Sequence, residues 1–387
     1  MSTALEHLDC KRDIVRRLRR VVVKIGSGVL SSPDGLRRDR IAALAAQLHE
    51  IDREGRQVIV VTSGAIASGQ SRLRLPSRPT SVRMKQAVAA VGQIDLMALY
   101  EETFTALGRH VAQILLTRDD FANRGRYLNA HHTLATLLDL DIIPIINEND
   151  SVAVDEVKFG DNDLLSALTA TLVDADLLVI LSDVPGLYEA DPQTIHDAPI
   201  ISLLASVDDA ARGRAGPRAG ALGTGGMASK LDAAAVAQRA GIPTIIADGG
   251  RDGILRMVLD PEVEVGTLIV AAGDHLARRK HWIAYTLKPA GSLTLDDGAR
   301  EAVVQRHRSL LPSGLRAVEG RFGPGECVRC LDPSGREFAR GLVNYSDSEL
   351  RKIAGAHSRD IEKHLGYKVS DEVIHRDDLV VLDSEPT

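Results

Sequence analysis

Short apolar runs rich in β-branched residues alternate with helical patterns along most of the chain, from about residue 20 to residue 270. Segments with apolar residues at helical spacing separate the runs, which fall at 21–23, 58–61, 111–116, 142–146, 177–181 and 244–246. Strands that are apolar on both faces and alternate with amphipathic helices are typical of a parallel sheet covered on both sides. We therefore predict an α/β fold for residues 15–272, a three-layer αβα sandwich with a mainly parallel sheet.

The composition favours the same architecture. Apolar residues make up 44% of the chain but aromatic residues only 3%, so the core must consist of Ala, Val, Leu and Ile. Such a core suits helices on a buried sheet better than an aromatic-rich antiparallel sandwich. The chain has 47 basic and 53 acidic residues, a formal net charge of −6, which argues against a whole-molecule clamp for a polyanion.

The pattern changes after about residue 272. Short strand candidates separated by Gly, Pro and Asp turns follow at 292–295, 314–319, 327–331 and 338–342. One helix is expected at 348–354, with Ser346 or Ser348 as its N-cap. We predict a linker at 273–290, a small β-rich domain at 291–373 and a C-terminal tail at 374–387.

The cysteine content and the hydropathy of the chain indicate its cellular compartment. The three cysteines, Cys10, Cys327 and Cys330, cannot make a disulfide framework. Cys327 and Cys330 lack a second Cys pair for a structural zinc site, and in a strand their side chains would point to opposite faces. The first twenty residues carry charge throughout, without a signal-peptide pattern, and no apolar run approaches the ~20 residues that span a bilayer. We expect a cytoplasmic protein that binds no membrane and no structural metal.

Polar or glycine-rich clusters follow several predicted strands, where ligands bind in open α/β sheets. The clusters are Lys24-Ile25-Gly26-Ser27, Thr62-Ser63-Gly64, Asn147-Glu148-Asn149-Asp150, Gly160-Asp161-Asn162-Asp163, Ser182-Asp183 and Gly223-Thr224-Gly225-Gly226-Met227-Ala228-Ser229-Lys230. Glycine after a strand most often only permits a tight turn, so no single cluster identifies a site. The Asn and Asp residues of the third and fourth clusters exceed what two turns require. They suit the ammonium group of an amino-acid substrate, or they hold a lysine in place.

Two lysines, Lys24 and Lys230, each adjoin a glycine-rich loop that leads into a helix. Backbone N–H groups and positive helix ends at such places hold phosphate oxygens. Phosphoryl transfer depends mainly on positioning and cationic charge, and a carboxylate acceptor, with a reference pKa of about 4.3, needs no general base. We therefore predict phosphoryl transfer from ATP to a small anionic acceptor, with both lysines in one pocket. A dinucleotide-binding dehydrogenase is the weaker reading, because the second strand ends in Thr62 and Ser63, with no acid for a ribose.

Six ordered motifs resemble the glutamate 5-kinase family, which has the amino-acid kinase fold. They are Lys24-Ile25-Gly26-Ser27, Val61-Thr62-Ser63-Gly64-Ala65-Ile66, Ile146-Asn147-Glu148-Asn149-Asp150, Gly160-Asp161-Asn162-Asp163, Gly186-Leu187-Tyr188 and Gly223-Thr224-Gly225-Gly226-Met227. The later part, including Gly341-Leu342-Val343-Asn344-Tyr345 and Ile353-Ala354-Gly355, resembles a PUA domain. The resemblance covers the chain from about residue 20 to residue 382.

The resemblance implies transfer from ATP, with Mg²⁺, to the side-chain carboxylate of L-glutamate, the first step of proline biosynthesis. It implies a catalytic group of Lys24, Lys230 and Asp163, with Asp163 orienting the two lysines. The implied glutamate-binding residues are Ser63, Asn147, Asp150 and Asn162. The implied ATP-binding residues are Lys24, Gly26, Ser27, Ser182, Asp183, Thr224, Gly225, Gly226, Met227, Ala228, Ser229 and Lys230.

The resemblance implies two further properties, and this sequence departs from the family pattern at two positions. Inhibition by proline and a homo-oligomeric state are expected. Ser182 stands where the family often has Thr, which keeps the hydroxyl group. Gly28 stands where a polar residue is commoner, and glycine offers no side-chain contact at that position.

Two alternatives stay open. One is another kinase of this fold, acting on acetylglutamate, aspartate, carbamate or UMP. The other is an RNA-binding PUA protein with a vestigial kinase domain, for which Arg278-Arg279-Lys280 and Arg351-Lys352 supply local charge. The many acids and the few aromatic residues of this region argue against RNA and favour a structural or regulatory role.

Overall fold

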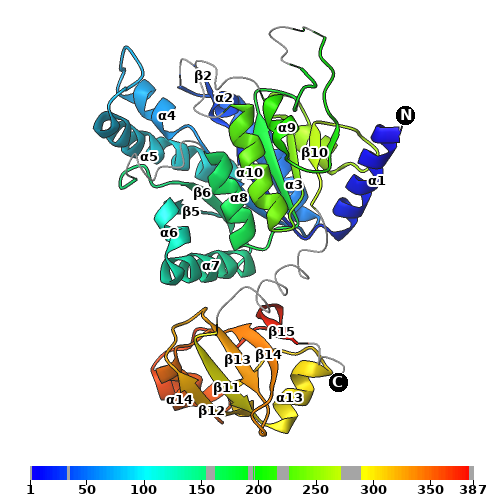
Figure 1. The fold of residues 1–387 in the computed structure, drawn as a ribbon. Helices are drawn as coiled ribbons and strands as arrows, with labels where there is room; N and C mark the ends of the chain where they lie inside the picture. The colour runs from blue at the N-terminus through cyan, green and yellow to red at the C-terminus, as the bar shows by residue number, and fades with distance from the viewer. Residues whose placement is uncertain are drawn as a thin grey trace. The chain divides into compact units, whose positions relative to one another are not determined.

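Figure 1 shows the fold in a computed structural model of the chain. The structure describes residues 2–32, 35–153, 162–190, 195, 197–215, 226–271 and 289–382. The chain divides into two compact units, Met1–Ala272 and Gly273–Thr387. No helix among the described residues is long and apolar enough to cross a membrane.

An eight-stranded sheet, in the order β5-β6-β4-β1-β7-β9-β10-β8, forms the centre of the first unit (Figure 1). Neighbouring strands from β5 to β9 in this order are parallel. At the far end, β10 is antiparallel to β9 and parallel to β8. The strand bounds are β1 (Arg20–Ile25), β4 (Gln57–Val61), β5 (Val111–Leu116), β6 (Ile143–Glu148), β7 (Leu177–Ser182), β8 (Leu203–Leu204), β9 (Thr244–Asp248) and β10 (Thr267–Ile269), and a separate pair is formed by β2 (Ser31–Ser32) and β3 (Gly35–Leu36).

Helices cover both faces of this sheet. Successive β1 side chains point to opposite faces, so Val21 and Val23 lie in one hydrophobic core and Val22 in the other. The first core takes residues of α3, α5 and α11, and the second takes residues of α7, α8 and α10. The predicted three-layer αβα sandwich is confirmed. The helix bounds are α1 (Ser2–Arg17), α2 (Ser27–Leu30), α3 (Arg38–Arg53), α4 (Ala65–Arg72), α5 (Val82–Ala106), α6 (Arg118–Ala122), α7 (Arg124–Asp139), α8 (Asn162–Leu172), α9 (Asp209–Gly213), α10 (Met227–Arg239) and α11 (Ile254–Leu259).

The helices α4 and α5 pack against each other at backbone distance. A Cβ atom added at Gly92 of α5 would lie 1.9 Å from the carbonyl oxygen of Ala65 and 2.2 Å from the amide nitrogen of Gly69, both on α4. A Cβ atom at Gly69 would lie 1.9 Å from the carbonyl oxygen of Val88. Only glycine fits at these two positions, and the two helices are therefore held in one fixed arrangement.

The N-terminal helix α1 belongs to the first unit, although it begins before residue 15, where the sequence places the start of the domain. Cys10 and Ile14 pack on the first core. Lys11 is fully buried, and its ammonium group donates to the carbonyl oxygens of Met257, at 2.7 Å, and Val263. Burial lowers the pKa of Lys11 to about 8, despite the opposing charge of Asp260.

The second unit is built on a five-stranded sheet in the order β12-β11-β13-β14-β15. One hydrophobic core contains residues of its strands and of the helices α13, α14 and α15. Ser346 caps α14 in a capping box with Glu349, as one of the two predicted caps. The last strand falls within 374–387, the predicted tail, and pairs with β14. The bounds are β11 (Gly291–Leu295), α13 (Asp297–Val304), β12 (Leu315–Gly320), β13 (Cys327–Leu331), β14 (Glu337–Leu342), α14 (Asp347–Ile353), α15 (Ile361–Leu365) and β15 (Leu379–Val381).

Candidate functional site

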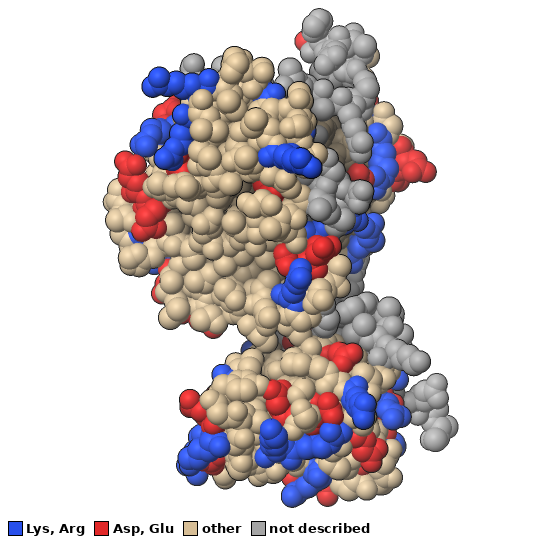
Figure 2. All heavy atoms as spheres, turned by 90° about the vertical axis from the view of Figure 1, so that its left-hand side faces the viewer, with Lys and Arg blue, Asp and Glu red and all other residues tan. Residues whose placement is uncertain are grey.

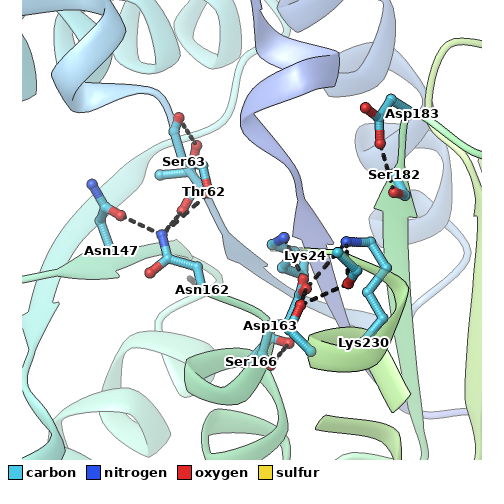
Figure 3. Close-up of polar contacts among 12 residues, drawn as sticks. Lys24, Thr62, Ser63, Asn147, Asn162, Asp163, Ser166, Ser182, Asp183 and Lys230 are labelled. Carbon is cyan, nitrogen blue, oxygen red and sulfur yellow. Dashed lines mark hydrogen bonds and ion pairs between the residues drawn. The ribbon is translucent and has the colours of Figure 1, made fainter. Parts of the chain in front are cut away.

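Two lysine ammonium groups meet one carboxylate at the carboxyl edge of the first sheet (Figure 3). Lys24 lies near the end of β1, Asp163 in the first turn of α8 and Lys230 in the first turn of α10. Lys24 Nζ pairs with Asp163 Oδ1, and Lys230 Nζ lies 3.2 Å from Asp163 Oδ2. All three residues are buried, and Asp163 has no exposed surface. The structure therefore brings together three residues that lie far apart in the sequence.

The charges of this cluster determine what it can bind. Burial by itself raises the pKa of Asp163, but the ammonium groups of Lys24 and Lys230 outweigh burial and bring the pKa to about 2. Ser229 Oγ adds a hydrogen bond to Asp163 Oδ2 at 2.8 Å and also lies 2.8 Å from the carbonyl oxygen of Gly226. An ionised carboxylate between two ammonium groups leaves one net positive charge in a buried position. Phosphate oxygens are suitable partners for such a charge.

A chain of side-chain amides begins at Asn162, the first residue of α8. Asn162 Nδ2 donates to the carbonyl oxygen of Thr62 and to Asn147 Oδ1, the latter at 2.7 Å, and lies 3.2 Å from Ser63 Oγ. Asn147 Nδ2 in turn donates to Gln93 Oε1 of α5 at 2.8 Å. The structure thus brings the ends of β4 and β6 and the start of α8 together in one cluster of hydrogen-bonded polar side chains near the lysines (Figure 3).

Asp150 lies on the segment that follows β6 and is half-buried. The backbone N–H of Asn149 donates to the carbonyl oxygen of Leu116 at 2.9 Å, which ties this segment to the end of β5. Gln86 of α5 donates to the carbonyl oxygen of Ala153 at 2.9 Å. The segment that carries Asp150 is therefore held at both ends.

The ends of the neighbouring parallel strands β1 and β7 lie side by side at the same edge of the sheet. Gly26 N donates to the carbonyl oxygen of Leu181 at 3.0 Å, and Ser182 Oγ donates to Asp183 Oδ1 at 3.0 Å. A Cβ atom added at Gly28 would lie 3.2 Å from Asp183 Oδ2. The glycine that departs from the family pattern thus leaves space for the Asp183 side chain.

The start of α10 carries the remaining described residues that are expected to bind ATP. Gly226 is the N-cap, and Met227, Ala228 and Ser229 form the first turn with Lys230. Unpaired N–H groups of a helix start suit phosphate oxygens. Ser27 opens the short helix α2. Thr224 and Gly225, like Gly160 and Asp161 of an earlier motif, lie outside the described residues.

Comparisons with known proteins identify the family of both parts of the chain. The amino acid kinase family matches residues 19–248, and the PUA domain matches residues 291–365. A glutamate 5-kinase of Geobacter sp. (strain M21) is 51% identical over 373 residues, which cover 96% of this chain and 100% of the relative. This chain belongs to the glutamate 5-kinase family.

Two further members of the family show a similar level of identity. The glutamate 5-kinase of Citrifermentans bemidjiense is 52% identical over 373 residues, covering 96% of this chain and all of the relative. That of Geobacter sulfurreducens is 51% identical over 370 residues, covering 95% of this chain and 99% of the relative. The similarity to glutamate 5-kinases therefore extends over both units, and the recognition of a C-terminal PUA domain from the sequence is confirmed.

The motifs of the glutamate 5-kinase family did not reveal Gln93. It lies inside α5, away from the polar and glycine-rich clusters that follow the predicted strands. A signal was available, because Gln93 follows the buried Gly92 and precedes the buried Leu96 by one helical turn. A polar residue at the border of an apolar helix face requires a hydrogen-bond partner when it is buried.

Proposed function

We propose that this chain transfers the γ-phosphoryl group of ATP to the side-chain carboxylate of L-glutamate, giving ADP and L-glutamyl 5-phosphate, the first step of proline biosynthesis. The observation that carries the proposal is the convergence of Lys24 and Lys230 on Asp163 at the carboxyl edge of a parallel sheet. The full-length similarity to glutamate 5-kinases supports the choice of glutamate over acetylglutamate, aspartate, carbamate or UMP.

The chemistry needs charge neutralisation more than proton transfer. The acceptor carboxylate is already ionised, and it must approach an anionic phosphate. Each pair of unit charges repels by about 4 kcal/mol at about 4 Å and an effective dielectric constant of about 20. The ammonium groups of Lys24 and Lys230 offset this repulsion and the charge that develops during transfer. Asp163, with a pKa of about 2, stays ionised and orients the lysines instead of accepting a proton.

Glutamate would lie on the amide side of the lysines. Asn162 and Ser63, whose side chains lie 3.2 Å apart, would bind it, and Asn147 would support Asn162 through a hydrogen bond. The carboxylate of Asp150 suits the α-ammonium group, since the two carry opposite charges. The side-chain carboxylate of glutamate then faces Lys24 and the phosphate.

ATP would lie on the opposite side, between the ends of β1 and β7 and the start of α10. Gly26 and Ser27 let the phosphates approach the backbone of the first loop, and Ser182 and Asp183 border the nucleotide. The loop from Thr224 to Lys230 would hold the phosphates through Gly225, Gly226, Met227, Ala228 and Ser229, with Lys230 reaching the transferring group. These assignments rest on the family pattern and on the places of the described residues.

Mg²⁺ fits this scheme as a partner of ATP. Among the described residues, no three His, Cys, Asp or Glu side chains gather into a cluster that could hold a metal ion. Mg²⁺ is usually bound through substrate phosphates with only one or two protein carboxylates, so such a cluster is not required. When bound, the ion would neutralise phosphate charge alongside Lys24 and Lys230.

An acceptor panel tests the proposal. The purified protein is given ATP, Mg²⁺ and one acceptor each, and acyl phosphate is trapped as hydroxamate while ADP release is followed in parallel, because UMP forms no hydroxamate. We expect hydroxamate with L-glutamate, and its loss in Lys24→Ala and Lys230→Ala. Lys11→Met is the matched control, because it removes a buried lysine that contacts Met257 instead of the site. Hydroxamate with another acceptor but not with glutamate would contradict the proposal.

The remaining features of the enzyme are proposed from its family. We expect inhibition by proline, measured as a fall in glutamate turnover, and a homo-oligomer, measured by light scattering. We place the enzyme in the cytoplasm, with catalysis in residues 15–272 and a structural or regulatory role for the domain at 291–373. Lys and Arg side chains of the second unit lie interspersed with Asp and Glu on the face shown in Figure 2, which supports this role over RNA binding. Saturable, salt-dependent RNA binding would contradict it.

A further inference from the structure

We infer that Gln93 determines substrate specificity by donating a hydrogen bond to the α-carboxylate of glutamate. The inference rests on the proposed function and adds a contact that no motif of the chain indicates. Gln93 lies on α5, and its side chain accepts a hydrogen bond from Asn147, one of the residues proposed to bind glutamate. Three observations carry the inference: the polarity of the amide chain, the buried N–H group at its end, and the place of that end relative to the lysines.

The polarity of the amide chain is set by a backbone carbonyl. The N–H of Thr62 is bonded to the carbonyl oxygen of Ile146 at 2.8 Å, so the backbone at the end of β4 is tied to the sheet. The carbonyl oxygen of Thr62 can only accept, and the Asn162 side chain must therefore present its NH₂ group to it. The same NH₂ group lies against Asn147, which must then present its oxygen.

The chain of donors continues to Gln93. The side-chain oxygen of Asn147 accepts from Asn162, so the NH₂ group of Asn147 faces Gln93. Gln93 must therefore present Oε1 as the acceptor. If the Gln93 amide were turned by 180°, its NH₂ group would lie against the NH₂ group of Asn147. The Gln93 NH₂ group is thus left at the end of the chain. Gln93 Nε2 is buried and has no hydrogen-bond partner among the residues that the structure describes.

A buried donor of this kind calls for an acceptor. Buried polar groups in proteins almost always have a partner, and a carboxylate gives a stronger hydrogen bond than a neutral acceptor. Glutamate brings two carboxylates. The side-chain carboxylate must reach the lysines, and Asn162 adjoins the lysine partner Asp163 in the sequence. Gln93 lies two hydrogen bonds beyond Asn162, at the far end of the amide chain, and the group left for it is the α-carboxylate.

The helix that carries Gln93 is fixed before substrate arrives. Its neighbour Gly92 packs on the backbone of α4, which begins directly after Ser63 and Gly64. Two turns earlier on the same helix, Gln86 is bonded to Ala153. A donor on such a rigid element is preorganised, so it discriminates between ligands without having to be ordered by them.

Gln93→Glu is the decisive variant. A glutamate side chain keeps an oxygen for Asn147 and replaces the NH₂ group by a second oxygen. Wild type and variant are compared with L-glutamate and with its α-carboxamide, isoglutamine, which keeps the side-chain carboxylate but carries an NH₂ group at the α-carboxyl end. We expect kcat/KM for glutamate to fall roughly 100-fold, chiefly through KM, because a hydrogen bond to a charged group becomes a like-charge contact. The preference for glutamate over isoglutamine should fall by a similar factor, with the KM for ATP unchanged.

Controls separate specificity from folding. Gln93→Met, which removes both the acceptor and the donor, should also reduce the preference, and it replaces the first variant if that one fails to fold. Gln47→Met removes an amide of α3 that binds Leu255 instead of the pocket, and it should leave the preference at the wild-type value. If the Gln93 variants slow both substrates equally, Gln93 only supports the fold or binds water, and the inference is wrong. If the wild type does not phosphorylate glutamate at all, the proposed function fails instead.

Discussion

Replacing Asp163 by Asn removes one negative charge from a fully buried position and leaves the shape of the side chain nearly unchanged. The cluster with Lys24 and Lys230 then changes from one net positive charge to two. A pKa lowered from 3.8 to about 2 corresponds to about 2 kcal/mol of stabilisation by the ionised carboxylate. The substitution also leaves two buried ammonium groups without their counter-charge, and breaking a buried ion pair costs about 3–5 kcal/mol. We therefore expect Asp163→Asn to lower the free energy of unfolding of the first unit by about 3–5 kcal/mol.

Hydrogen exchange is the suitable assay, because a chain of two compact units has no single free energy of unfolding. Exchange of the β1 and α8 amides is measured in Asp163→Asn and in wild type, with and without ATP. Bound phosphates supply the missing negative charge, so ATP should protect the variant more than it protects wild type. Asp252→Asn is the control, since that carboxylate is 99% exposed in its pair with Arg40 and should contribute less than about 1 kcal/mol.

The pH dependence gives an independent check. Between the folded pKa of about 2 and the unfolded value of 3.8, the folded state binds fewer protons at Asp163 than the unfolded state. The stabilisation by Asp163 is therefore complete above about pH 4 and is lost as the pH falls toward 2, and the difference between wild type and Asp163→Asn should shrink in that window. Equal exchange rates for the two proteins at neutral pH, or equal protection by ATP, would refute the reasoning.

Four further outcomes are expected. Lys24→Ala and Lys230→Ala should each lower kcat about 10²–10³-fold, as for loss of a transition-state donor, and near-normal turnover in either would remove that lysine from the mechanism. Lys11 has a folded pKa of about 8, below the unfolded value of 10.5, so the free energy of unfolding of the first unit should rise as the pH increases from about 8 to 10.5. Lys11→Met should flatten this rise when it is measured by hydrogen exchange. The same pH dependence in the variant and in wild type would disprove the lowered pKa of Lys11. Ser346→Ala should cost the second unit about 1 kcal/mol through loss of the α14 cap, seen as faster exchange of α14 amides, and unaltered exchange would speak against the cap. Gly92→Ala should destabilise the first unit by about 1–3 kcal/mol or more, because its Cβ would meet the α4 backbone, and should raise the KM for glutamate; wild-type stability and KM would show that α4 and α5 yield readily.

The sequence predicted the layered fold well because its strands are apolar on both faces. Val21, Val22 and Val23 leave no polar side for solvent, and a buried parallel strand is the consistent interpretation. The helix α1 was not predicted, since its main anchor is a buried lysine, Lys11, which a hydropathy pattern reads as exposed. The strand β10 and its antiparallel direction were also not predicted, because three residues are too short a pattern to indicate a strand or its direction.

At the site, strand ends were more informative than helices. Lys24, Asn147 and Ser182 stand at the carboxyl ends of parallel strands, where topology brings side chains together regardless of their separation in sequence. The pairing of both lysines with one carboxylate is a matter of side-chain distance, which spacing alone does not give. Gln93 shows the limit most clearly, since the role proposed for it depends on the polarity of hydrogen bonds that start at Thr62 on another element.

The single counter-charge at Asp163 also bears on how the reaction ends. Two buried ammonium groups without a carboxylate would hold any phosphorylated species tightly, including the product that must leave. Affinity shared equally by the ground state and the transition state adds nothing to turnover once substrate is saturating. With Asp163 between the lysines, the cluster retains one net positive charge instead of two. We therefore expect it to hold a phosphorylated product less tightly than two uncompensated lysines would.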